Sequence, residues 1–330
     1  MKNIVVTGIG TISPLGIGFN DYQDKYVSKD AAIFEDIDID ELCMDMDVRR
    51  NDRFTKFGLA AFRDLVKHFK YFDIDPDGRG IIANTYFGPV NTVNDFLQTA
   101  MDGGLDQASP MLFSNTVINA GLGRISIEYK LKGISYMLCG SNPLYYAIKD
   151  VRENCSQVVF AGGIDDTESQ LAFTRNGERE FYESSSFIGL EQEGSAKKRG
   201  AEIMARIHGV GMASIANQFE CCDISSEYFY RAMDKALHES GVEEKDIRKV
   251  YLCSTEPGME TEAVNRLFQL REIHTPDIVY SRDNFRKYLS AGEFFTLFDG
   301  IIDMTLNNIT VPAIVNIKAL NCITSIVISR

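Results

Sequence analysis

Short runs of β-branched and aliphatic residues recur along the chain, and several of them end in glycine. They predict buried strands at residues 4–8, 80–84, 157–163, 249–253, 311–316 and 324–329. Between the strands, apolar residues recur at helical spacing, and this spacing predicts helices at residues 52–69, 143–153, 227–240, 259–271 and 292–307. Short strands that alternate with helices indicate an α/β protein whose strands are covered on both faces.

No Pro-rich or Ser-rich linker divides the chain. Residues 175–200 are the most polar and least periodic stretch, and we expect them to form a long loop between two halves. Each half contains a strand, a turn and a helix in succession, at 136–141 before Pro143 and at 250–254 before Met259. These two units are a hint of internal duplication.

Composition and charge narrow the class of protein. Hydrophobic residues make up 45% of the chain and charged residues 25%, which is typical of a globular protein with a full core. The net charge of -13 disfavours binding to nucleic acid or to anionic membranes, because their phosphates would be repelled. No apolar run approaches the ~20 residues that span a bilayer, and the N-terminus has no cleavage-site pattern. We therefore expect a cytoplasmic protein that has no contact with membranes.

The seven cysteines, at 43, 139, 155, 221, 222, 253 and 322, are scattered. No CxxC pair and no His/Cys cluster has the spacing of a zinc site, so we expect buried, reduced thiols and neither a metal nor a cofactor. The four histidines, at 68, 208, 238 and 274, have no motif around them. The sequence therefore offers few candidates for a catalytic imidazole.

Residues 6–16, Val-Thr-Gly-Ile-Gly-Thr-Ile-Ser-Pro-Leu-Gly, closely resemble the first strand and loop of β-ketoacyl synthases. Further matches follow in the order of that family, at residues 49–57, 109–110, 123–127, 131–133, 161–163, 187–189, 198–201, 209–212 and 254–255. The resemblance implies the thiolase-like fold, a five-layered αβαβα sandwich of two similar halves that is usually dimeric. The halves would be residues 1–200 and 201–330, packed as one unit.

The departures from the family are informative. Alignment on Ala147 and Ile148 puts Ser141 at the position of the family's nucleophilic cysteine. Cys139 lies two residues earlier, where it would miss the helix N-terminus that lowers the pKa of a thiol. The segment at 141–143 is also typical of a helix start, with Ser141 or Asn142 as the N-cap and Pro143 in the first turn.

The other catalytic positions of the family are changed as well. The first family histidine falls within residues 251–253, at or beside Tyr251, the family lysine falls near Ser281, and the second histidine falls near Arg286. A glycine-rich segment is replaced by residues 319–322, and the family's V-L-V-L-E strand is largely absent at 193–195. Decarboxylative condensation needs a thiolate and donors for the developing oxyanion. We therefore expect no catalytic residues in this chain.

A member of this family without its nucleophile implies the chain-length factor, or ketosynthase β subunit, of a type II polyketide synthase. Such a subunit pairs with an active ketosynthase α subunit and limits chain length at a tunnel that crosses the heterodimer interface. The tunnel candidates are Met111, Leu112, Phe113, Thr116, Val117 and Ile118. The dimer-interface candidates are Tyr136, Met137 and Leu138.

Two other functions stay open. One is an independent acyltransferase or hydrolase that uses Ser141 or Cys139, and the other is a scaffold subunit without a tunnel. In the chain-length reading, the acyl carrier protein that bears the polyketide should dock mainly on the partner, because the charge of this chain opposes an acidic carrier. Local exceptions would be Arg175, Arg179 and residues 197–199.

Overall fold

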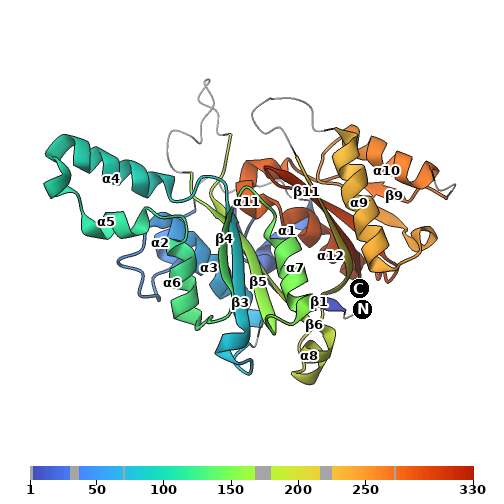
Figure 1. Ribbon diagram of the computed structural model, residues 1–330, viewed down its shortest axis with the longest axis horizontal. Helices are drawn as coiled ribbons and strands as arrows, with labels where there is room; N and C mark the ends of the chain where they lie inside the picture. The colour runs from blue at the N-terminus through green and yellow to red at the C-terminus, as the bar shows by residue number, and fades with distance from the viewer. Residues whose placement is uncertain (1–2, 30–36, 70, 168–179, 216–224, 271–272) are drawn as a thin grey trace.

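The computed structural model describes residues 3–29, 37–69, 71–167, 180–215, 225–270 and 273–330. These residues form an 11-stranded sheet and the helices that cover it (Figure 1). The strands are β1 (Ile4–Ser13), β2 (Gly16–Ile17), β3 (Arg79–Thr85), β4 (Ser135–Cys139), β5 (Val158–Asp165), β6 (Ser184–Gln192), β7 (Ala205–Ser214), β8 (Lys249–Tyr251), β9 (Asp277–Val279), β10 (Ala313–Lys318) and β11 (Cys322–Ser329). The helices are α1 (Phe19–Ser28), α2 (Ile39–Leu42), α3 (Arg53–His68), α4 (Val90–Gly103), α5 (Pro110–Asn115), α6 (Ala120–Tyr129), α7 (Pro143–Glu153), α8 (Glu193–Lys198), α9 (Ser226–Ser240), α10 (Met259–Gln269), α11 (Leu289–Gly292) and α12 (Phe295–Leu306).

The strand order repeats in the two parts of the sheet. The path runs β4-β3-β5-β6-β1 and then, in mirror order, β7-β11-β10-β8-β9. In each part the outer strand pairs are parallel and the inner pairs are antiparallel. The first strand of each part, β1 and β7, pair with each other over residues 4–6 and 205–207, which joins the two parts at the centre.

Three apolar clusters separate five layers, which follow one another from left to right in Figure 1. One cluster packs α3 and α6 on the outer face of the set β4-β3-β5-β6-β1. The central cluster encloses α7 and α12 between both sets of strands. The third packs α9 and α10 on the outer face of the second set. This arrangement confirms the αβαβα sandwich of the thiolase-like fold.

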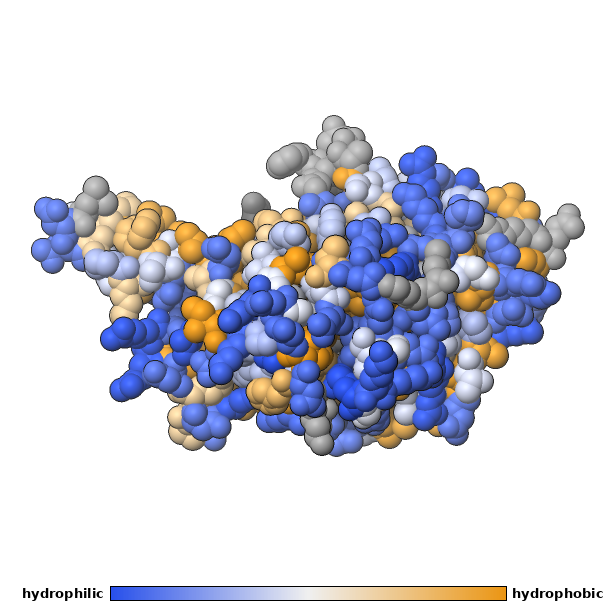
Figure 2. Space-filling view, turned by 60° about the horizontal axis from the view of Figure 1, so that its bottom comes forward, coloured by the Kyte–Doolittle hydropathy of each residue, from blue (hydrophilic) through white to orange (hydrophobic). Residues whose placement is uncertain are grey.

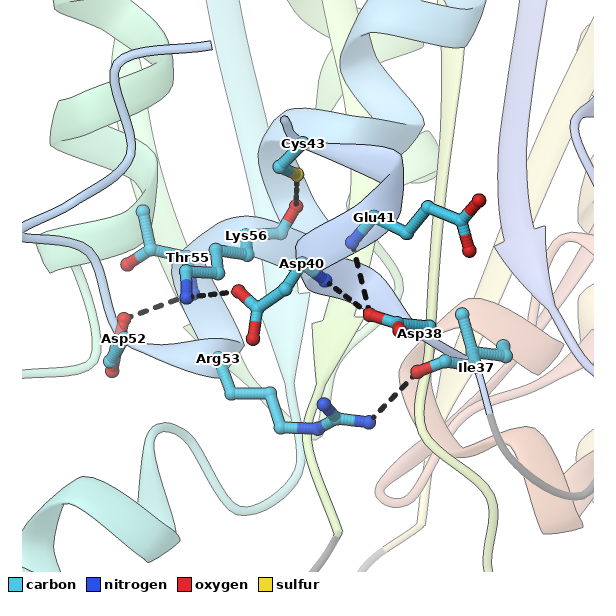
Figure 3. Close-up of polar contacts among 9 residues, drawn as sticks. All are labelled: Ile37, Asp38, Asp40, Glu41, Cys43, Asp52, Arg53, Thr55 and Lys56. Atoms are coloured by element: carbon cyan, nitrogen blue, oxygen red, sulfur yellow. Dashed lines mark hydrogen bonds and ion pairs between the residues drawn. The ribbon is translucent and has the colours of Figure 1, made fainter. Parts of the chain in front are cut away.

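The entry into α3 shows how the local sequence fixes these layers (Figure 3). The carboxylate of Asp52 accepts a hydrogen bond from the backbone N–H of Thr55 at 3.0 Å and so caps the helix at the predicted residue. Lys56, one turn along, pairs with Asp40 of α2 at 2.5 Å. Arg53 donates to the carbonyl of Ile37 at 3.2 Å. Helix α2 is therefore held against the first turn of α3.

The expected loop at 175–200 is wrong in its second part. Residues 184–192 form the buried strand β6, which pairs with both β1 and β5, and α8 follows directly. Residues 193–195, where the family's V-L-V-L-E strand was expected to be largely absent, lie in α8. The sequence conceals β6 because its buried face carries polar residues. Glu191, for example, is fully buried, where it pairs with Arg199 and accepts from Thr7.

The hint of duplication matched the wrong units. In chain order, β4, which leads into α7, is the third strand on the path of the first set. By contrast, β8, which leads into α10, is the second strand of the other set. The topological counterpart of β4 and α7 is β9 followed by α12. The division at residue 200 stays a prediction.

Candidate functional site

The turn from β4 into α7 forms an elbow at residues 139–142. Gly140 has a φ of 72°, a left-handed conformation that glycine adopts without strain, and it reverses the chain between strand and helix. Asn142, the second of the two candidate caps, accepts a hydrogen bond from the backbone N–H of Leu144 at 3.1 Å. Pro143 occupies the first helical position, where its missing N–H has no consequence. The elbow is therefore a well-formed helix start.

The turn between β10 and β11 lies against this elbow. The backbone N–H of Asn321 donates to the carbonyl of Gly140 at 3.0 Å, and the backbone N–H of Ser141 donates to the side chain of Asn84 at 3.3 Å. The hydroxyl of Ser141 lies 3.9 Å from the Sγ of Cys322. Residues 319–322 therefore pack directly on Gly140 and Ser141.

No histidine is among the described hydrogen-bond partners of Ser141. His208 bonds the hydroxyl of Ser329 at 2.8 Å, His238 lies in the last turn of α9, and His274 is exposed beyond α10. A serine hydroxyl without an adjacent base is a weak nucleophile. The elbow thus offers a hydroxyl and a thiol, without the imidazole that would activate either.

The cysteines only partly follow the expectation of burial. Cys43 and Cys322 are buried, but Cys139 and Cys155 are exposed, and Cys221 and Cys222 lie outside the described residues. The exposure of Cys139 follows from its place at the end of β4, an edge strand whose outer side is uncovered. Its Sγ lies 4.0 Å from the carbonyl of Tyr86.

A buried carboxyl group supports the elbow from below. Glu293, which follows α11, accepts hydrogen bonds from the side-chain amides of Asn84 at 2.7 Å and Asn142 at 3.0 Å. Burial raises the pKa of Glu293 well above its ordinary value. The same layer holds Asp165, whose carboxylate accepts from Thr85 at 2.8 Å and from Ser290. Both groups accept hydrogen bonds from donors of their own chain.

A pocket of about 310 Å³ opens beside this network. It is bounded by the ends of β8 and β10, by the first turn of α10 and by the segment that leads into α11. Arg286 lines it, as does Cys253. Tyr251 and Ser281 do not, because the hydroxyl of Tyr251 donates to Asp303 at 2.6 Å and that of Ser281 donates to the carbonyl of Asp283 at 2.7 Å.

Two of the three comparisons with known proteins find similar proteins. No family model matches the chain. A 3-oxoacyl-[acyl-carrier-protein] synthase 2 of Staphylococcus aureus (strain N315) is 25% identical, with 75% of this chain and 71% of the relative covered. Over about three quarters of its length the chain is therefore similar in sequence to β-ketoacyl synthases.

Solved structures share its fold over the whole length. The structure described as the ishigamide ketosynthase/chain length factor has a TM-score of 0.79 at 16% sequence identity. The match covers 99% of this chain and 99% of that chain. A type II polyketide synthase acyl carrier protein in complex with its ketosynthase bound to the hexaketide has a TM-score of 0.77 at 14% identity, with 99% of both chains covered. These likenesses establish the thiolase-like architecture of the β-ketoacyl synthase-like chain.

The tunnel candidates of this β-ketoacyl synthase-like chain lie on an arm formed by α4, α5 and residues 116–118. The arm projects from the body at the left of Figure 1, and Figure 2 shows apolar residues gathered on it. Phe113 is 60% exposed and Met111 52%, and Val117 and Ile118 are exposed as well. Leu112 and Thr116 are half-buried. None of the six is a core residue of this chain.

The dimer-interface candidates lie on β4, at the edge of the sheet. This strand pairs with β3 on one side, and no described strand pairs with its other side. Tyr136 is exposed, and Met137 and Leu138 are half-buried. An apolar edge strand with unpaired backbone groups is a surface that proteins usually cover.

One further expectation concerns the basic residues of this chain. Among the basic residues expected as local carrier contacts, Arg199 forms an ion pair with Glu191, and Lys197 pairs with Glu193 at 2.8 Å. Lys198 is exposed. Arg175 and Arg179 lie outside the described residues.

No cluster of three metal-ligating side chains is found in the described ranges. No helix in those ranges has the length and apolar content required to cross a membrane.

Proposed function

We propose that this chain is the non-catalytic chain-length factor subunit of a type II polyketide synthase and that it pairs with an active ketosynthase α subunit. The proposal rests on Ser141 at the elbow, which the alignment puts at the position of the family's cysteine and which has no histidine among its described hydrogen-bond partners. Without a thiolate and its oxyanion donors, the condensation step has no nucleophile in this subunit.

The exposed surfaces support a role as a partner. The edge strand β4 and the apolar arm both leave large hydrophobic side chains in solvent. Contiguous exposed apolar surface of this kind marks protein–protein contacts. We propose that β4 pairs with the active subunit and that the arm reaches over it. The name of the ishigamide ketosynthase/chain length factor, whose fold this chain shares, agrees with such a pairing.

The proposed mechanism is steric. The growing chain is attached to the cysteine of the partner and extends towards the interface, where bulky residues of the arm stop it. Limiting length in this way requires volume at the right depth and no reactive group. The acyl carrier protein would deliver its substrate on the partner, because the charge of -13 on this chain opposes an acidic carrier.

The test is the length of the products made by the co-expressed pair. Each malonyl extension adds two backbone carbons, so removal of one bulky side chain from the end of the tunnel should admit at least one more unit. We expect Phe113→Ala and, separately, Met111→Ala to shift the products towards longer chains. Both side chains are more than half exposed in this subunit, so truncation leaves no internal cavity in it.

Matched controls are available on the body of the chain. Phe72 is 75% exposed and Met44 78%, and neither belongs to the arm. Their alanine variants remove the same side chains from the surface and should leave product length unchanged. If both arm variants give wild-type lengths while the pair stays assembled, the arm does not set the length.

A further inference from the structure

The arm, which projects from the body in Figure 1, meets it at a root formed by residues 89–92. Thr92, in the first turn of α4, is the only fully buried residue of α4 and α5, both of which the structure describes throughout. Helix α4 packs chiefly against α5 and residues 105–107, which belong to the arm itself. At the other end of the arm, the side chain of Asn115 donates one hydrogen bond to a backbone carbonyl of the body at 3.1 Å. The position of the arm therefore depends largely on the contacts of the root.

Two side chains of the root donate hydrogen bonds to carboxyl groups of the body. The amide of Asn91 donates to Oδ1 of Asp166, which directly follows β5. The hydroxyl of Thr92 donates to Asp52, the cap of α3, at 2.8 Å. The arm is therefore fixed to two body elements, β5 and α3, through their carboxyl groups.

Four carboxyl groups gather at this point. Asp165, the last residue of β5, and Glu183, which precedes β6, lie beside the two that hold the root. Asp165, Asp166 and Glu183 are buried. The cation of the cluster is Arg53 of α3, which donates to both oxygens of Glu183 at 2.7 and 2.5 Å. If all four carboxyl groups were ionised, negative charge would exceed positive charge in a buried place, so the cluster favours a proton on one of its members.

Asp166 is the member best placed to hold this proton. Its side chain is fully buried, and its Oδ2 has no hydrogen-bond partner in the described chain. Burial is the main cause that raises the pKa of Asp166 to about 8. The neighbouring carboxylates Glu183, Asp52 and Asp165 raise this pKa further, and Arg53 opposes them. A proton on Oδ2 leaves Asp166 without charge at neutral pH.

Opening of the root is therefore linked to the proton on Asp166. Movement of the root away from the body would admit water, and a solvated aspartate has a pKa of about 4. Between about pH 4 and about pH 8, the closed root retains a proton that the open root releases. Rising pH therefore favours the open root in this range by up to about tenfold per pH unit, and the effect levels off above about pH 8.

We propose that the root is a proton-dependent joint of the arm. While Asp166 carries a proton, the hydrogen bonds of Asn91 and Thr92 hold the arm against the body. When Asp166 releases the proton, water enters the root and the arm moves away. The joint concerns the movement of the arm in this chain, whatever the arm does. Its consequence, a product length that varies with pH, rests on the proposed function.

The test is hydrogen exchange measured by mass spectrometry on the full chain, with its partner where the two co-purify, at pH 6, 7 and 8. Exchange in peptides of α4 is expressed as protection relative to the chemical exchange rate at each pH, so that only opening of the structure is compared. We expect the protection of α4 in the wild type to fall by about tenfold or more from pH 6 to pH 8. In Asp166→Asn, where the side chain cannot ionise, the fall should be less than about threefold.

Two controls separate the joint from a general loosening of the chain. Asp150 of α7 is another carboxyl group whose pKa is raised by burial, and it lies outside the root. Asp150→Asn should therefore keep the pH dependence of α4 that the wild type shows. Peptides of α9, on the outer face of the second set of strands, should change in protection by less than about threefold from pH 6 to pH 8.

Asn91→Ala removes one hydrogen bond of the root without a change of charge. It should lower the protection of α4 at pH 6 by about threefold or more. Circular dichroism shows which variants are folded, and if Asp166→Asn fails to fold, Asn91→Ala decides.

Four results would each overturn the joint. They are equal α4 protection at pH 6 and pH 8 in the wild type, an unchanged pH dependence in folded Asp166→Asn, unchanged α4 protection in folded Asn91→Ala, and an equal fall in α9. Products of constant length from pH 6 to pH 8, made while α4 loosens, would instead contradict the role of the arm in setting length and leave the joint in place.

Discussion

Replacement of Asn142 by alanine tests whether the elbow of this chain serves structure. Asn142 is fully buried and makes two contacts, as the cap of α7 and as a donor to Glu293. Loss of an N-cap side chain costs about 1 kcal/mol, and a buried carboxyl oxygen left without its donor costs about 1–3 kcal/mol. We therefore expect Asn142→Ala to lower the free energy of unfolding by about 2–4 kcal/mol.

Asn142→Ser separates the two contributions. Serine caps a helix about as well as asparagine, but its hydroxyl is too short to reach Glu293, so we expect a loss of about 1–3 kcal/mol. Ser141→Ala is the matched control one residue away. The hydroxyl of Ser141 has only the Sγ of Cys322, at 3.9 Å, as a described partner, and its loss should cost less than about 0.5 kcal/mol.

Urea unfolding followed by far-UV circular dichroism measures these differences, with the partner present in every sample if the chain requires it. The slope against urea should stay constant across the variants, which shows that the same surface is exposed in each. The reasoning is refuted if Asn142→Ala unfolds within about 0.5 kcal/mol of the wild type. It is also refuted if Ser141→Ala is as unstable as Asn142→Ala.

Three other predictions follow from the same structure. Ser141→Ala should leave product formation by the pair within a few-fold of wild type; a loss of ~100-fold, ~2.7 kcal/mol in the barrier, would mean that Ser141 does chemistry. Thioester turnover by the purified chain that disappears on changing Ser141 or Cys139 would identify an independent acyltransferase or hydrolase. Burial raises the pKa of Asp166 to about 8, so the folded chain retains a proton that the unfolded chain releases above about pH 4, and stability falls as the pH rises from about 4 to 8. In Asp166→Asn the free energy of unfolding should fall less steeply between pH 4 and 8, by up to about 1.4 kcal/mol per pH unit, as measured by denaturation at several pH values. The same pH dependence of unfolding in the variant and the wild type would contradict the assignment. Lys132→Glu, at an exposed residue outside the 197–199 cluster, should change the affinity for the carrier protein by less than about twofold, and a loss of binding would place docking on this subunit.

The amino-acid sequence by itself determined the elements whose signals are local. The helix α7 begins and ends where its pattern predicts, because Asn142 and Pro143 form a helix start and apolar residues recur at helical spacing after them. The start of α3 at Asp52 is equally local. The prediction that Ser141 replaces the family's nucleophile likewise comes from the sequence alone, since it depends only on the alignment at Ala147 and Ile148.

The tertiary structure alone decided what covers each element. Strand β6 was missed because Glu191 is buried against Arg199 and Thr7, so that polar residues occupy a core strand. Phe113 has the apolar character of a core residue and yet lies exposed on the arm. The pocket unites Arg286 and Lys318 from separate strands and turns of the second half. The physical reason is the same in each case: periodicity along the chain reports which face of an element is apolar, whereas burial and pairing depend on contacts between residues far apart in the sequence.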